Sequence, residues 1–179
     1  KIGLQGNRSP ADELFLKHIL ESAASATAMA TRDPSPLTQS RSLLMQFTGS
    51  TEIQNWVPEA GCGLEILDLR PRAAAMANRT GGYGYENTSY YMGTTLQFCN
   101  IGNIHAVRDS FAKLNSLCMN NNSSDLQWQT ALEDTKWLSL VRLILAASWE
   151  SAFWIHVHRL PVLLHCSHGW DRTSQVAVL

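Results

Sequence analysis

A cysteine and an arginine six positions apart carry the clearest chemical signal in the chain. Cys166 directly follows an apolar stretch, residues 160–165, and Arg172 opens the last segment, which is apolar over residues 176–179. A strand that turns through a short loop into a helix offers a phosphate the N–H groups of the loop and the positive end of the helix dipole. The same field lowers the pKa of a cysteine, so that a thiolate faces the phosphorus. The spacing therefore predicts a phosphate-binding loop in which Cys166 attacks phosphorus and forms a phosphocysteine intermediate.

Other residues of this loop suit the same chemistry. The planar guanidinium of Arg172 can bind two phosphate oxygens at once, a contact that tightens as charge spreads over those oxygens in the transition state. Gly169 allows the tight turn that makes the N–H groups converge. The hydroxyl of Thr173 can donate to the Cys166 sulfur, and His165 can orient that sulfur through the neighbouring backbone. We expect these groups to hold Cys166 as an anion.

The leaving alkoxide needs a proton, and Asp171 lies inside the loop as the candidate general acid. It must be protonated at the moment when it donates. The alternative is a buried strand-end cysteine and a helix-start arginine that share this spacing by chance. The preceding strand, the following threonine and the Gly-Trp-Asp sequence inside the loop make that alternative the weaker one.

The elements around the loop indicate an α/β domain, because helices and strands alternate along the chain. Residues 31–50, rich in Ser, Thr and Pro, are predicted to be a flexible connection or an insertion. The strand over 160–165 is apolar throughout and is expected at the centre of the sheet. The long helix over 130–158 is so apolar that most of it is expected to be buried. The predicted elements are a helix over 11–30, a strand over 64–69, a helical turn over 73–77, a glycine loop over 81–86, a strand over 96–99, helices over 103–119 and 130–158, a strand over 160–165 and a last helix after Arg172.

Bulk composition excludes several classes of function. The chain has 179 residues, 45% hydrophobic and 16% charged, with a net charge of −1, so nothing favours a nucleic-acid partner. The chain has no run of 18 apolar residues, so no membrane span is predicted. The four cysteines include no Cys-x-x-Cys pair, so they fit neither a zinc site nor a disulfide framework. We therefore expect no metal and no cofactor. Cys62, Cys99 and Cys118 are expected to be buried or half-buried free thiols. The chain begins at Lys1 and stops inside a predicted helix, so a piece of a longer protein, truncated at both ends, is expected.

Several segments resemble the myotubularin phosphatases. The loop over 165–173 reads His-Cys-Ser-x-Gly-Trp-Asp-Arg-Thr, which is similar to the active-site signature of that family, and its Trp-Asp pair separates the family from classical tyrosine phosphatases. The family's other segments have counterparts at 68–86 (Asp-x-Arg-Pro…Ala-Asn…Gly-Gly), at 103–108 (Asn-Ile-His-x-x-Arg) and at 133–138 (Glu-Asp-Thr-x-Trp-Leu). Together these segments cover about residues 64–179.

The resemblance implies a cysteine-based, protein-tyrosine-phosphatase-like domain, with a central sheet flanked by helices, over the whole of 1–179. It implies a phosphoric monoester hydrolase that removes the 3-phosphate of phosphatidylinositol 3-phosphate and phosphatidylinositol 3,5-bisphosphate. It further implies a cytoplasmic protein peripheral to endosomal or other intracellular membranes, with possible homo- or hetero-oligomers of myotubularin-type chains. The substrate-binding residues that it implies are Asn78, Asn103, Ile104, Ser167, His168, Gly169, Trp170 and Thr173.

Two points stay open at this stage. Asn78 and Asn103 also suit helix capping, and Asn103 stands where a helix is predicted to begin. Active members of the family usually carry Asp where this chain has His168, and an imidazole there either strengthens binding of a charged headgroup or impairs proton transfer. The alternatives to an active lipid phosphatase are therefore a pseudo-phosphatase or phosphoinositide-binding scaffold and, less specifically, a protein tyrosine phosphatase.

Overall fold

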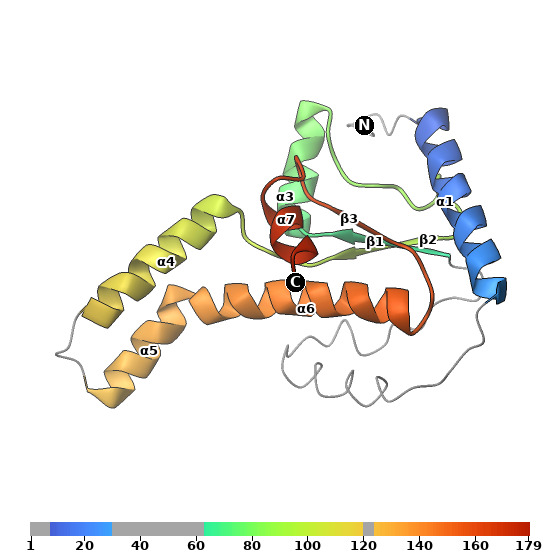
Figure 1. Cartoon of the computed structure of the whole chain (residues 1–179). Helices are drawn as coiled ribbons and strands as arrows, with labels where there is room; N and C mark the ends of the chain where they lie inside the picture. Colours follow the sequence, from blue (N-terminus) through green and yellow to red (C-terminus); the bar gives the residue numbers. More distant parts are fainter. Residues whose placement is uncertain (1–7, 30–62, 120–123) are drawn as a thin grey trace.

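A parallel sheet of three strands lies at the centre of the computed structural model, which describes residues 8–29, 63–119 and 124–179 (Figure 1). The strands are β1 (Leu64–Asp68), β2 (Thr94–Phe98) and β3 (Val162–His165), in the order β2-β1-β3. The helices are α1 (Pro10–Met29), α3 (Arg72–Ala77), α4 (Ile104–Met119), α5 (Asp125–Thr135), α6 (Trp137–His156) and α7 (Arg172–Ala177), with a 3-10 turn η2 (Asn78–Gly81). The predicted α/β order therefore holds, and the predicted loop over 31–50 lies outside the described residues.

The central strand is β1, so the expectation that residues 160–165 form the centre of the sheet is wrong. Every residue of β1 is buried, whereas every residue of β3 is only half-buried. β1 pairs in parallel with both other strands, and β3 pairs with β1. The apolar run of β3 is covered on one side by helices α6 and α7, which explains its composition at the edge of the sheet formed by the described residues.

The predicted long helix over 130–158 is two helices. Lys136 has a φ of 62° and separates α5 from α6, and the Thr135 hydroxyl accepts a hydrogen bond from the Trp137 N–H at 3.2 Å. A residue in the left-handed conformation ends a helix. The apolar periodicity that predicts a helix nevertheless continues across Lys136. The sequence pattern therefore predicts the helical content here and misses the break.

The expectation that most of this long helix is buried is also wrong. The face of α6 that packs on the sheet buries Phe153 and Trp154, but Leu138 and Leu145 are 59% and 52% exposed. By length and composition α6 is also the one described helix that could cross a membrane. Core helices have the same composition, and α6 carries a buried glutamate, Glu150, whose Oε1 accepts from the Trp154 indole at 2.8 Å. Packing against the rest of the domain accounts for the buried apolar residues of α6, whereas Leu138 and Leu145 face solvent.

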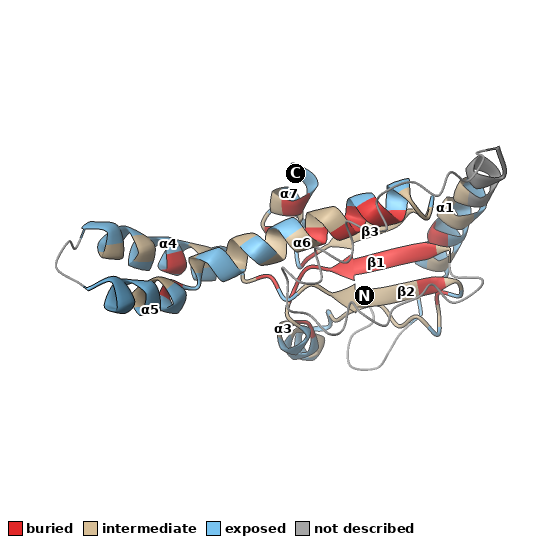
Figure 2. Ribbon diagram, turned by 90° about the horizontal axis from the view of Figure 1, so that it is seen from below, coloured by how far each residue is buried: buried red, intermediate tan, exposed pale blue. Residues whose placement is uncertain are grey.

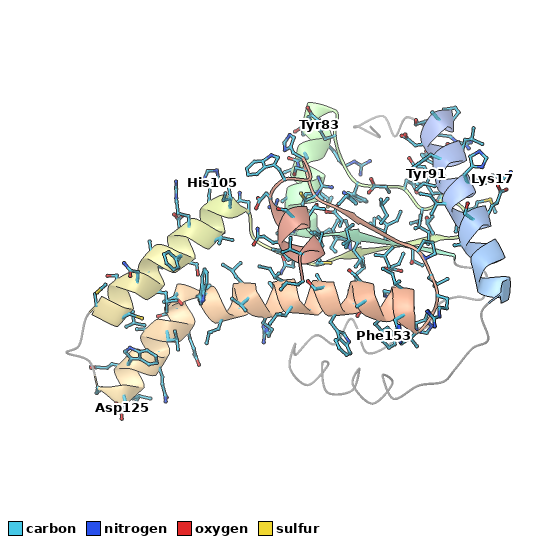
Figure 3. The ribbon with its side chains drawn as sticks, viewed as in Figure 1. Lys17, Tyr83, Tyr91, His105, Asp125 and Phe153 are labelled. Carbon is cyan, nitrogen blue, oxygen red and sulfur yellow. The ribbon has the colours of Figure 1, made fainter. Side chains whose placement is uncertain are left out.

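Helices α4 and α5 form an arm that extends away from the sheet (Figures 1 and 2). His105 lies at the end of the arm near the sheet, and Asp125 lies at the far end (Figure 3). The two helices join through Ser110, whose hydroxyl donates to the Thr135 carbonyl at 2.7 Å. The arm thus begins beside the sheet and is attached to the start of α6.

The apolar core reaches the predicted nucleophile. One cluster of buried residues packs between the carboxyl end of the sheet and helices α6 and α7, and a second fills the space between the sheet and α1. The first cluster contains Cys166, so the loop that begins there starts from a rigid base. Its members are Leu67, Leu69, Ile101, Ala147, Cys166 and Val176.

The other cysteines divide by exposure. Cys99 is half-buried and free, and burial, aided by the charge of Asp68, raises the pKa of its thiol to about 12. Cys118 is free but exposed, so the expectation of a buried or half-buried thiol is wrong there. It lies near the C-terminal end of α4, where its side chain is exposed. Cys62 lies outside the described residues.

Glu65 provides a prediction on stability. This β1 carboxyl is 2% exposed, and burial raises its pKa from 4.5 to about 7, opposed by the Thr95 hydroxyl and reinforced by the charge of Glu150. The folded state therefore holds the proton more tightly than the unfolded state, so stability is fully present below about pH 4.5 and is lost as pH rises through about 7. Glu65→Gln should remove that loss, which amounts to roughly 3 kcal/mol. Urea unfolding at about pH 5 and about pH 8 measures it.

The control for this measurement is Glu133→Gln, which neutralises an exposed carboxylate on α5. That variant should keep the decline in stability seen in the parent protein. An equal decline in Glu65→Gln would show that Glu65 does not carry it.

Candidate active site

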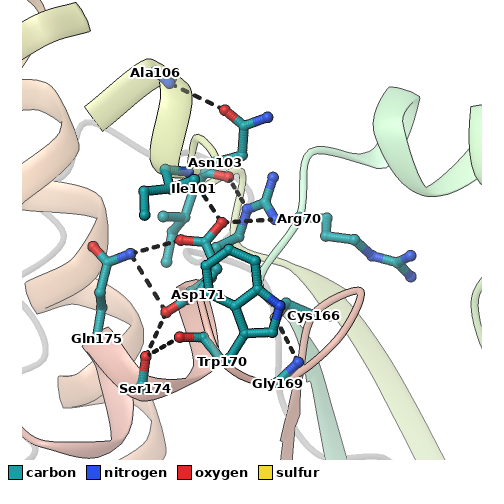
Figure 4. Close-up of polar contacts among 12 residues, drawn as sticks. Arg70, Ile101, Asn103, Ala106, Cys166, Gly169, Trp170, Asp171, Ser174 and Gln175 are labelled. Atoms are coloured by element: carbon teal, nitrogen blue, oxygen red, sulfur yellow. Dashed lines mark hydrogen bonds and ion pairs between the residues drawn. The ribbon is translucent and has the colours of Figure 1, made fainter. Parts of the chain in front are cut away.

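The loop between β3 and α7 wraps around the sulfur of Cys166 (Figure 4). The Leu69 N–H donates to the His165 carbonyl at 2.9 Å, which fixes the end of β3 against β1. The Gly169 N–H then points back at Cys166 Sγ from 3.3 Å. Gly169 has a φ of +80°, a conformation that a residue with a Cβ adopts only with strain. Glycine at this position therefore allows the loop to curl around the thiol.

The surroundings of Cys166 favour the thiolate. Burial raises the pKa of the thiol, but the hydroxyl and N–H of Thr173 and the N–H groups of His168 and Gly169 outweigh it and lower the pKa to about 7. Hydrogen bonds donated to a charged group stabilise that form. A substantial fraction of Cys166 is therefore anionic near neutral pH, as a nucleophile requires.

Arg172 is held in place before any ligand arrives. Its side chain is buried, and its Nε donates to the Ile101 carbonyl at 2.8 Å, in the segment that follows β2. Its Nη1 lies 3.8 Å from Asp171 Oδ2. Because Nε is already bonded, the terminal N–H groups are the ones left to bind phosphate oxygens.

Asp171 joins the loop to the start of α4. Its Oδ2 accepts from the Ile104 N–H at 3.0 Å, and its Oδ1 accepts from Gln175 Nε2 at 3.1 Å (Figure 4). Asn103 precedes this helix, and its Oδ1 accepts from the Ala106 N–H at 3.0 Å, which is the capping role left open by the sequence. The structure therefore brings Asn103 and Ile104 beside the loop through Asp171.

The remaining predicted residues differ in how far they are buried. Asn78 is half-buried where α3 passes into η2, and its carbonyl accepts from the Tyr83 N–H at 3.1 Å. Trp170 is 63% exposed, so the loop is not braced by burial of its indole. The exposed positions along the loop are Ser167, His168, Gly169 and Trp170.

A buried ion pair beneath the loop was not predicted as part of the site. Arg70 donates to both oxygens of Asp68, at 2.8 and 2.6 Å, and also to the Gly84 carbonyl at 2.7 Å. The bonded Asp68 carboxylate raises the pKa of Arg70, and the charge of Cys166 adds to the shift. Two opposite charges two positions apart, at and just after the end of a buried strand, are the signal that the sequence offered.

A neighbouring set of side chains has the composition of a metal site but not its arrangement. Ligand atoms of Asp68, Glu86 and His165 lie within 4.8 Å of one another. Both oxygens of Asp68 already accept from Arg70, and Glu86 Oε2 lies 3.0 Å from His165 Nε2. These residues therefore form two ion pairs, and the chemistry of the site rests on the thiol.

Comparison with known proteins agrees with this geometry. A family model described as a myotubularin-like phosphatase domain matches residues 1–179. The chain is 40% identical over 114 residues to phosphatidylinositol-3,5-bisphosphate 3-phosphatase MTMR8 of Gallus gallus, covering 64% of this chain and 18% of that protein. It is 42% identical over 116 residues to phosphatidylinositol-3,5-bisphosphate 3-phosphatase MTMR4 of Homo sapiens (65% and 10%) and 39% identical over 116 residues to myotubularin of Xenopus laevis (65% and 19%). The chain spans less than a fifth of the length of these relatives.

Proposed function

The chain belongs to the myotubularin-like phosphatase family, and on that premise we propose that it hydrolyses the 3-phosphate of phosphatidylinositol 3-phosphate and phosphatidylinositol 3,5-bisphosphate. The names of two relatives specify a 3-phosphatase acting on the bisphosphate. Because the substrate is a membrane lipid, the protein acts at the cytoplasmic surface of endosomal or other intracellular membranes. Association with further myotubularin-type chains is part of the same proposal.

The reaction has two displacements at phosphorus. The Cys166 thiolate attacks the 3-phosphate, the P–O bond to the inositol ring breaks, and Asp171 gives its proton to the leaving oxygen. Water then attacks the phosphocysteine and loses a proton to Asp171, which releases inorganic phosphate and restores the thiolate. Arg172 holds two phosphate oxygens through both steps and stabilises the charge that develops on them.

The observation that carries the proposal is the loop that curls around Cys166 and points the Gly169 N–H at its sulfur from 3.3 Å. The surrounding loop, through Thr173 and the N–H groups of His168 and Gly169, lowers the pKa of the thiol to about 7 against the effect of burial. A loop with this geometry binds a dianionic phosphate in the position that the sulfur attacks. Two further groups, Arg172 and Asp171, are fixed beside it by the Ile101 carbonyl and the Ile104 N–H.

The test measures phosphate release by the longest natural polypeptide that contains these residues. The substrates are a short-chain phosphatidylinositol 3-phosphate, the corresponding 3,5-bisphosphate and a phosphotyrosine peptide, with Cys166→Ser as the blank. Release that favours the lipids and vanishes in the blank supports the proposal. Preference for the peptide would indicate a tyrosine phosphatase, and lipid binding without release would indicate a scaffold.

The unusual residue of the loop, His168, gives a second prediction. Its side chain is exposed, while its N–H is one of the groups that stabilise the Cys166 thiolate. Asp supplies the same N–H, so His168→Asp should change kcat by less than about tenfold, while a new negative charge weakens binding of the headgroup and raises KM. Steady-state kinetics on both lipids measure the two constants. A gain in kcat of more than about a hundredfold would instead mean that the natural loop is catalytically impaired.

A further inference from the structure

Both ring nitrogens of His165 face acceptors. Nε2 lies 3.0 Å from Glu86 Oε2, and Nδ1 lies 3.3 Å from the carbonyl of Cys166. A neutral imidazole has one N–H and one lone pair, so it can donate to only one of these oxygens. The imidazolium can donate from Nδ1 to the Cys166 carbonyl while its positive charge pairs with the Glu86 carboxylate. A carboxylate 3.0 Å from one ring nitrogen and a carbonyl 3.3 Å from the other therefore favour the cation at the residue that directly precedes the nucleophile.

Glu86 is the group that makes this cation stable. It comes from the loop after η2, and its side chain and that of His165 are about a quarter exposed, at 28% and 21%. Burial alone would lower the pKa of His165 and raise that of Glu86. The attraction between the two side chains outweighs burial, so the pKa of His165 is raised and that of Glu86 is lowered. An ion pair so shielded from solvent is screened much less than one at the surface.

The other charges around the pair have their own partners. Asp68 accepts from Arg70 with both oxygens, and Arg70 also donates to the Gly84 carbonyl, two residues before Glu86. From α7, Arg172 donates its Nε to the Ile101 carbonyl, and the Asp171 carboxylate accepts from the Ile104 and Gln175 N–H groups. Glu86 is thus the carboxylate that forms the ion pair with His165, and replacing it leaves these other contacts in place.

We propose that Glu86 is a positioning residue that keeps His165 as an ion-paired cation behind Cys166 and so maintains the nucleophile as a thiolate. The inference rests on the proposed role of Cys166 as nucleophile. It also gives the loop over residues 82–86 a function, because that loop carries both Glu86 and the Gly84 carbonyl that Arg70 binds. The loop connects the buried ion pair of β1 to the base of the phosphate loop.

The test follows alkylation of Cys166 by iodoacetamide as a function of pH, read by mass spectrometry of the peptide that contains it. Alkylation reports the thiolate fraction and needs no turnover, so failure of the proposed phosphatase activity would leave this readout intact. In Glu86→Gln the alkylation profile should move to higher pH by about one unit, because the neighbouring positive charge is lost. Glu86→Asp, which keeps the carboxylate, should restore most of the shift.

Three comparisons make the result specific. Asp109→Asn removes an equal charge on the exposed face of α4 and should leave the profile in place. In a His165→Gln background, Glu86→Gln should have no further effect, because the two residues act as one unit. The profile of exposed Cys118, read in the same samples, serves as the internal reference. An unmoved Cys166 profile in folded Glu86→Gln, or additive effects in the double variant, would overturn the proposal.

Discussion

Cys166→Ser is expected to lose phosphate release by at least about 10⁴-fold, the loss typical when a catalytic nucleophile is removed. The loop groups that lower the pKa of the thiol to about 7 cannot do the same for an alcohol, whose pKa lies far above the working pH. The measurement is phosphate release from a short-chain phosphatidylinositol 3-phosphate under single-turnover conditions. Substrate binding should survive, because the N–H groups and the Arg172 guanidinium remain in place.

Binding therefore separates the chemical role of Cys166 from a structural one. Cys166→Ser should bind the lipid within about tenfold of the parent protein, measured by calorimetry with short-chain lipid. A matched change at the exposed thiol, Cys118→Ser, should leave both binding and release unaltered. Release from Cys166→Ser within tenfold of the parent value would exclude the phosphocysteine route.

Asp68→Asn is expected to lower the free energy of unfolding by about 3–5 kcal/mol. Asp68 is fully buried and its two oxygens accept from Arg70, which is 3% exposed. Asparagine has nearly the same shape but no charge, so the variant leaves a buried guanidinium without its counter-ion. Urea unfolding at fixed pH, with the slope m checked for constancy, measures the effect.

Two comparisons isolate the ion pair. Asp109→Asn breaks an exposed pair with Arg108 and should cost less than about 1 kcal/mol. Asp68→Asn combined with Arg70→Met should recover part of the lost stability, because the uncompensated charge is then gone. A cost below 1 kcal/mol for Asp68→Asn would mean that water or another carboxylate replaces the missing partner.

The sequence predicted the parts of the site that are local in the chain. The strand, the glycine-containing loop and the arginine at the start of the last helix lie within residues 160–173, so short-range rules were sufficient. The identity of Cys166, Asp171 and Arg172 as candidate groups came from that segment alone. Helices α1 and α4 were likewise predicted from apolar spacing to within about two residues.

Contacts between distant segments could not be predicted in this way. The Glu86–His165 pair and the Arg172–Ile101 bond join residues far apart in the chain, and neither leaves a pattern in either segment. The central position of β1 depends on which strands pair, whereas both β1 and β3 are short apolar runs. The break at Lys136 depends on one backbone conformation inside a continuous apolar pattern.

The parallel pairing of β1 with β3 has a consequence for how the protein folds. Glu65 pairs with Val162, so four helices of the chain lie between two strands that are neighbours in the sheet. Contacts of such high sequence separation are slow to form, because the entropy of closing the connecting chain is lost before they stabilise anything. During synthesis the first strand leaves the ribosome well before its partner exists. The nucleophile therefore reaches its working environment only after β3 has paired with β1, and a chain without that pairing carries an ordinary thiol in place of an activated one.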